Sequence, residues 1–132
     1  MTESNYSIET SVAKREVILR CAGTFDVATI TKLVGEYKQA TDKLNGEKHV
    51  VLADMRGLKT MSEEVATIFG EAIMYGREKG TVRCAHLADS AIQRLQAKRM
   101  AREATPNDPI TVDVVDEDEA HKVLDEARAE LS

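Results

Sequence analysis

The sequence predicts an α/β domain with a mainly parallel sheet, an N-terminal antiparallel hairpin and helices packed on the sheet. Two observations predict it. Short apolar segments typical of strands alternate with longer segments of helical periodicity, in the order ββαβαβαβα. The chain has 132 residues, of which 42% are hydrophobic, and this is enough for one core. We therefore expect a single domain over residues 1–132.

The first half of the chain predicts a hairpin, a long helix and a buried strand. Residues 6–12 and 16–22 are two strand-like segments joined by a short charged connection. Asp26 is placed to cap the helix that follows. The apolar residues of this helix recur at helical spacing: Val27, Ile30, Leu33, Val34, Tyr37 and Leu44. Residues 49–54 are almost continuously apolar, as expected of a central parallel strand that is buried on both faces.

The second half predicts three helices and two strands. The first of these helices has an apolar stripe of Val65, Ile68, Phe69, Ala72 and Ile73. A strand over 82–88 leads into a helix from Asp89, whose clearest apolar positions are Ile92 and Leu95. A final strand over 110–115 precedes a helix over 116–131. The acidic run at the start of that last helix complements the positive end of the helix dipole.

The composition argues against several function classes. A net charge of −5 and a pI near 5.2 disfavour nucleic acid as a partner, because phosphate contacts require an excess of Lys and Arg. The N-terminus lacks the pattern of a secretory signal, and no apolar run reaches the roughly 20 residues of a membrane span, so we expect a cytoplasmic protein. We expect Cys21 and Cys84 to be reduced thiols of the core.

The sequence offers no catalytic constellation, metal site or cofactor motif. His49, His86 and His121 form no pair at the spacing of metal ligands. Only Gly57 follows the first predicted parallel strand, so a glycine-rich phosphate loop is missing there. Cys84 and His86 share one face of a strand, but no third group completes a nucleophilic site. We therefore expect no enzyme, no metal and no cofactor.

The segment before the second helix matches a helix-capping pattern. In Thr60-Met61-Ser62-Glu63, Thr60 can cap the helix while Glu63 reaches back to it. Ser62 can serve as the cap instead. Helix capping alone and a contact or regulatory role are both open for this segment, and one residue can do both.

Residues 50–65 and the order of elements resemble the STAS domain, whose bacterial members include antagonists of anti-sigma factors. In that family an apolar strand ends in Asp, and a short loop with Gly leads to Asp-Ser-Ser-Gly or Asp-Ser-Thr-Gly at the start of a helix. Here Val50-Val51-Leu52-Ala53-Asp54 is followed by Met55-Arg56-Gly57-Leu58-Lys59-Thr60-Met61-Ser62-Glu63-Glu64-Val65. The strand, the acidic turn and the Ala-bearing helix of residues 112–120 also resemble the end of the family domain.

The chain departs from the family at the phosphorylated serines. Ungapped alignment puts Ser62 at the family's Asp and puts Glu63 and Glu64 at the serine pair. A shift of one or two residues instead brings Ser62 to the phosphoacceptor position. In the first alignment a permanent carboxylate replaces the phosphate, with a smaller negative charge. Both alignments are open at this point.

The resemblance implies a non-catalytic protein–protein interaction module in bacterial signalling. Its partner would be a kinase-like anti-sigma factor or a signalling scaffold, and self-association into a homo-oligomer is a further expectation. Carried over by alignment, the partner-binding or regulatory loop consists of Asp54, Arg56, Lys59, Thr60, Ser62, Glu63 and Glu64.

A basic strip on the third predicted helix supports a second hypothesis. Arg94, Lys98 and Arg102 recur every fourth residue, and Arg99 lies beside them. Such a strip is either a solvated face or a contact for an anionic partner, including lipid headgroups. The alternative function is therefore a lipid-associated or lipid-transport accessory domain, and membrane contact belongs to that alternative alone.

Overall fold

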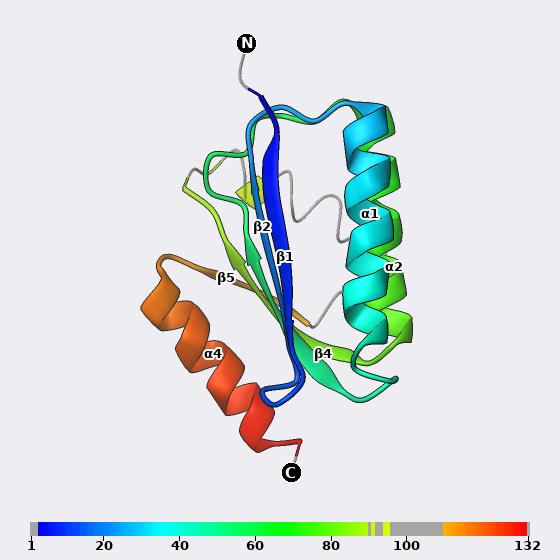
Figure 1. The fold of residues 1–132 in the computed structure, drawn as a ribbon. Helices are drawn as coiled ribbons and strands as arrows, with labels where there is room; N and C mark the ends of the chain where they lie inside the picture. The colour runs from blue at the N-terminus through cyan, green and yellow to red at the C-terminus, as the bar shows by residue number, and fades with distance from the viewer. Residues whose placement is uncertain (1–2, 90, 92–93, 96–109, 132) are drawn as a thin grey trace.

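A computed structural model describes residues 3–89, 91, 94–95 and 110–131 of the chain, which form a sheet with helices on both faces (Figure 1). The elements in chain order are β1 (Asn5–Ser11), β2 (Glu16–Ala22), α1 (Val27–Asp42), β3 (His49–Asp54), α2 (Glu63–Glu78), β4 (Thr81–Leu87), β5 (Thr111–Val114) and α4 (Glu117–Ala129). Most of the helix predicted from Asp89 lies outside the described residues, although 91, 94 and 95 are helical.

The sheet confirms the predicted α/β class with a mixed, mainly parallel sheet. Its five strands are ordered β1-β2-β3-β4-β5. The N-terminal pair β1–β2 is antiparallel, and the other three neighbouring pairs are parallel. Because parallel neighbours need a crossover, the β2–β3 and β3–β4 connections bring α1 and α2 against the sheet, whereas α4 follows the last strand.

Helices α1 and α2 cover one face of the sheet. Alternate residues of β2 and β3 point to that face, and Val17, Leu19 and Val51 are at most 3% exposed there. The predicted stripe of α1 is buried except for Val27, which is 38% exposed. Val27 is the first residue of the helix, where the chain has only just left the loop.

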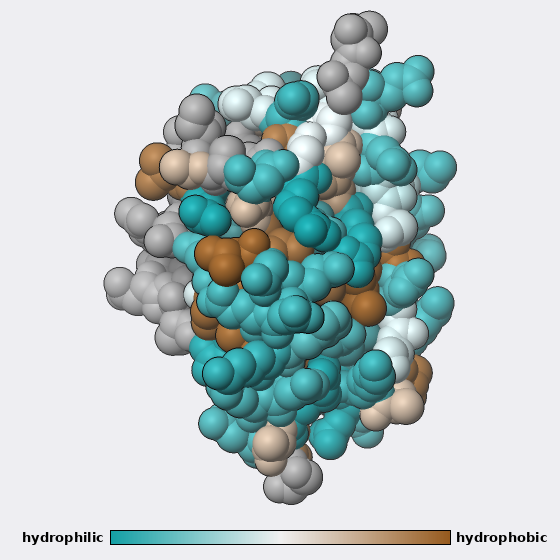
Figure 2. Space-filling view, turned by 90° about the vertical axis from the view of Figure 1, so that its left-hand side faces the viewer, coloured by the Kyte–Doolittle hydropathy of each residue, from teal (hydrophilic) through white to brown (hydrophobic). Residues whose placement is uncertain are grey.

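Helix α4 covers the opposite face (Figure 1). The intervening residues of the central strand, Val50 and Leu52, pack there with Leu87 and with Leu124 of α4. All six residues of β3 are thus buried, as the sequence predicted. Near the end of α4, Arg128 Nη1 donates to the buried Glu16 at 2.7 Å, which ties the helix to the start of β2. The surface over α4 is mostly hydrophilic, with small separate hydrophobic patches (Figure 2).

His49 is a buried histidine at the start of β3. Its Nδ1 lies 3.0 Å from the backbone oxygen of Glu47, and its Nε2 lies 2.8 Å from the hydroxyl of Thr81. A carbonyl only accepts, so the proton is on Nδ1 and Nε2 accepts from Thr81. Burial lowers the pKa of His49, despite an opposing effect of the Glu47 carbonyl. The ring is therefore neutral at physiological pH.

The two cysteines differ in their burial. Cys21 is 2% exposed, as predicted for a core thiol, whereas Cys84 is only half-buried. Burial, helped by the charge of Asp54, raises the pKa of Cys21 to about 12. A thiol with such a pKa stays protonated at neutral pH and is a poor nucleophile.

Candidate functional site

The candidate site begins where β3 ends, in the loop that leads to α2. Three side chains of this loop, Met55, Leu58 and Met61, are at most 8% exposed and anchor it in the core. The backbone N–H of Met55 also donates to the carbonyl of Leu87 at 2.8 Å, at the end of the neighbouring β4. The apolar residues between the predicted site residues therefore hold the loop in one place.

Two backbone hydrogen bonds connect the same loop to Gly23, which follows β2. Gly23 N–H donates to the Gly57 carbonyl at 3.0 Å, and Lys59 N–H donates to the Gly23 carbonyl at 2.9 Å. Gly23 has a φ of +85°, and a Cβ there would lie 2.0 Å from the backbone oxygen of Glu3. Only glycine fits this position, so the sequence of the β2–α1 connection helps to position the loop before α2.

Five exposed residues form what we call the α2 entry surface: Lys59, Thr60, Ser62, Glu63 and Glu64. Ser62 is the N-cap of α2, and its hydroxyl accepts from the backbone N–H of Val65 at 3.2 Å. The predicted capping by Thr60 is wrong, because α2 begins at Glu63, two residues later than that pattern required. The alternative prediction, with Ser62 as the cap, is confirmed.

The two glutamates of the α2 entry surface occupy the first turn of α2. Their carboxylates lie near the unpaired backbone N–H groups at the positive end of the helix, where negative charge is favoured. Both are exposed to solvent. The surface therefore presents negative charge and a hydroxyl next to one another on a rigid helix start.

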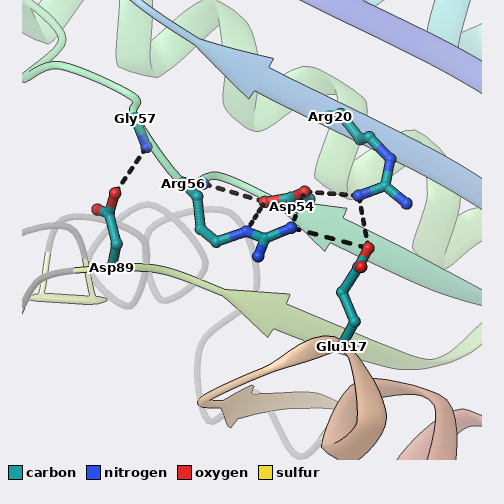
Figure 3. Close-up of polar contacts among 6 residues, drawn as sticks. All are labelled: Arg20, Asp54, Arg56, Gly57, Asp89 and Glu117. Atoms are coloured by element: carbon teal, nitrogen blue, oxygen red, sulfur yellow. Dashed lines mark hydrogen bonds and ion pairs between the residues drawn. The ribbon is translucent and has the colours of Figure 1, made fainter.

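Asp54, the last residue of β3, lies at the centre of an ion-pair cluster (Figure 3). Its carboxylate accepts from Arg20 Nη1 at 2.6 Å, and from Arg56 Nε and Nη2 at 3.0 and 2.9 Å. The backbone N–H of Arg56 donates to it as well, at 3.2 Å. Glu117, in the first turn of α4, accepts from Arg20 at 2.9 Å and lies 3.7 Å from Arg56. The cluster thus joins β2, β3, the loop and α4.

Opposing effects act on the pKa of Asp54. Burial alone would raise it, because the side chain is only 9% exposed. The hydrogen bonds from Arg56 and Arg20 outweigh burial and lower the pKa below its usual range. Asp54 is therefore ionised at neutral pH, and both of its oxygens are occupied by arginines.

The cluster separates the predicted site residues into two groups. The carboxylate of Asp54 is paired with Arg20 and Arg56 and its side chain is only 9% exposed, so it holds the loop in place and is not presented at the surface. The side chain of Arg56 is 43% exposed but is also engaged by Asp54. The α2 entry surface is the exposed part of the predicted loop that lies outside the cluster.

Sequence reasoning missed two members of the cluster and one further contact. Arg20 is 34 residues from Asp54 in the chain, and Glu117 is 97 residues from Arg20. The side chain of Asp89 accepts from the backbone N–H of Gly57 at 3.1 Å and forms another anchor of the loop (Figure 3). Arg20 lies near the end of β2, Asp89 follows β4 and Glu117 starts α4, and the carboxyl ends of parallel strands meet at one edge. That rule is the signal that could have found them.

The predicted basic strip can be placed only in part. Arg94 is helical and half-buried, whereas Lys98, Arg99 and Arg102 lie outside the described residues. No helix within the described ranges is long and apolar enough to cross a membrane. In the same part of the chain, no group of three His, Cys, Asp or Glu side chains could hold a metal ion.

Comparison with known proteins adds no assignment. No family model matches the chain, and no curated protein matches it significantly.

Proposed function

We propose that this chain is a non-catalytic protein–protein interaction domain of bacterial signalling, similar to the STAS domains that antagonise anti-sigma factors, and that it acts in the cytoplasm. The α2 entry surface is its contact surface. The observation that carries the proposal is the exposed acidic start of α2, with Ser62 as its cap. The sheet of five strands with an N-terminal antiparallel pair is compatible with it.

The rigidity of the α2 entry surface favours a recognition role. A loop that binds a partner loses less conformational entropy when it is already ordered before binding. Here the loop is anchored by buried methionines, by Gly23 and by the cluster around Asp54. The anchored backbone leaves Thr60, Ser62 and Glu64 exposed for contact.

Ser62 is the residue through which a kinase-like partner would regulate the surface. Ser62 is exposed at the helix start, and its hydroxyl oxygen accepts from the backbone N–H of Val65 at 3.2 Å. A phosphate on that oxygen would remain near the positive end of α2, which favours an anion. It would also stand beside Glu63 and Glu64, whose charges repel it. In the ungapped alignment with the STAS family, these two carboxylates instead act as permanent substitutes for a phosphate.

Photo-crosslinking tests whether the α2 entry surface is the contact. A photoreactive amino acid is placed at Thr60, and the matched control carries it at Glu126, which is exposed on α4 on the opposite side of the sheet. Both variants are irradiated in a lysate of the organism that carries the chain, and the adducts are identified by mass spectrometry. We expect an adduct with a kinase-like protein or a signalling scaffold from Thr60 and not from Glu126.

Two outcomes would contradict the proposal. Equal labelling from both positions would mean that the α2 entry surface is not selective. Labelling of only lipid-transport subunits would favour the accessory lipid function instead. If the captured partner has kinase activity, the two proteins are incubated with ATP and Ser62 is analysed by mass spectrometry. A phosphoryl group on Ser62 would mean that phosphorylation switches the surface. Its absence would mean that Glu63 and Glu64 supply the negative charge permanently.

A further inference from the structure

Strand β1 is an edge of the sheet whose outer side is accessible. It is the first strand in the order β1-β2-β3-β4-β5, so it pairs with β2 on one side only. No segment among the described residues pairs with its other side. Figure 1 views the sheet from this edge, with β1 in front of the other strands and with α1 and α4 to either side. Alternate residues of β1 therefore direct backbone N–H and C=O groups away from the protein.

This edge lacks most of the features that prevent strands from pairing with other chains. Natural edge strands are interrupted by proline, lysine or a β-bulge, or are covered. All seven residues of β1 pair with β2 in unbroken register, from Asn5 opposite Ala22 to Ser11 opposite Glu16. The strand contains no proline and no basic residue, and Glu9 is its one charge.

We propose that two copies of this chain pair through β1, antiparallel and about a two-fold axis at Ser7, so that the two five-stranded sheets become continuous. Antiparallel pairing about an axis is the way in which identical edges meet to form a closed dimer. In this register Ser7 faces its own copy, and Asn5 faces Glu9 of the second copy. The proposal is independent of the α2 entry surface, because it concerns another edge of the molecule.

The side chains of β1 are complementary in this register. On the face toward α1, each Tyr6 would lie opposite an Ile8 of the other copy, and pairs of aromatic and β-branched residues stabilise neighbouring strands. Both side chains are half-buried, and they already pack against the core under α1. Tyr6 is held there by a hydrogen bond to Glu36 and by its contact with Phe25.

The charges of β1 also fit this register. On the exposed face, Asn5 can donate its amide hydrogens to the carboxylate of Glu9 in the other copy. An axis at Glu9 would instead bring two carboxylates directly opposite each other, which is unfavourable. Glu3, just before β1, would face the uncharged Ser11 of the second copy. The register at Ser7 thus avoids every pairing of like charges over residues 3–11.

Sedimentation of the full chain over a dilution series measures the association. A single pair of strands is a small interface, so the dimer should dissociate on dilution. Ser7→Lys places two ammonium groups opposite each other at the axis and should raise the dissociation constant by about fivefold or more. Thr67→Lys is the matched control, because Thr67 is exposed on α2 and away from β1. A chain that stays monomeric throughout, or equal effects of the two lysines, would overturn the proposal.

Disulfide trapping tests the register itself. Across the axis, Asn5 and Glu9 would have Cα atoms about 4.5–5.5 Å apart, which a disulfide can span. Two copies of Asn5 would be offset by four residues, or about 14 Å, which it cannot span. A mixture of Asn5→Cys and Glu9→Cys chains should therefore cross-link, while each variant alone should give only the background of the wild type with Cys21 and Cys84. Cross-linking of either variant alone, or none in the mixture, would contradict the register.

Discussion

Replacing Asp54 by asparagine removes the charge at the centre of the ion-pair cluster. The carboxylate accepts three guanidinium hydrogen bonds, one from Arg20 and two from Arg56. Hydrogen bonds to charged groups contribute about 1.5–3 kcal/mol each when they are shielded from water. The side chains of both arginines are more than 40% exposed, so each pair is reduced to about 1 kcal/mol. We therefore expect Asp54→Asn to lower the free energy of unfolding by about 2 kcal/mol.

The assay is urea unfolding at neutral pH, followed by far-ultraviolet circular dichroism. Arg20→Gln should cost about half as much as Asp54→Asn, because Arg56 still binds both oxygens of the carboxylate. The double variant should lower the free energy of unfolding by less than the sum of the two single effects, since both changes remove the contact between Arg20 and Asp54. If Asp54→Asn lowers the free energy of unfolding by less than about 0.5 kcal/mol, as an ordinary surface substitution does, the ion pairs of Asp54 do not stabilise the fold.

The same variant should show a defined dependence on pH. The pKa of Asp54 is lowered in the folded protein, so its stabilisation is complete above the unfolded value of about 3.9 and is lost as the pH falls through the folded pKa. The difference between wild type and Asp54→Asn should therefore shrink below about pH 4, where the wild-type carboxyl becomes protonated. A difference that stays constant across this range would mean that the charge of Asp54 is not the cause.

Three further changes test other parts of the structure. Ser62→Ala should lower the free energy of unfolding by about 1 kcal/mol, because the helix loses its cap. Thr60→Ala should change it by less than about 0.5 kcal/mol. Equal changes for the two variants in urea unfolding would contradict the assignment of Ser62 as the cap. The lowered pKa of His49 means that the unfolded chain binds a proton more readily than the folded protein. The free energy of unfolding should therefore fall as the pH drops below about 6.5. In a His49→Gln variant it should fall less over the same range. Leu124→Ala should cost about 2–5 kcal/mol, because this side chain is fully buried between α4 and the sheet; a cost like that of an exposed residue would mean that α4 is not packed as described.

Strand bounds were predictable where burial left a clear pattern. The apolar run at 49–54 has the bounds of β3, because a strand buried on both faces permits few polar residues. The strand of residues 16–22 is likewise the strand β2. The first strand was predicted one residue too late in the chain, and the last strand was predicted one residue too long at each end. Exposed residues carry little information about where strand pairing stops.

The start of α2 shows why a local motif was insufficient. The pattern Thr60-Met61-Ser62-Glu63 is compatible with two capping residues, and in the structure Ser62 is the cap while Met61, between the two candidates, is buried in the core. That burial is a tertiary contact and leaves no mark in the local sequence. The cluster around Asp54 was hidden for a related reason, because Arg20 and Glu117 are brought to it only by the order of the strands.

We propose that the α2 entry surface recognises its partner through negative charge, and the affinity for the partner captured at Thr60 tests this proposal. Calorimetric titration compares wild type with Glu64→Lys and with Glu71→Lys, which makes the same change at an exposed position further along α2. We predict that Glu64→Lys weakens binding by about tenfold or more, as expected for reversal of a contact charge. Equal affinities for the two variants would contradict the claim.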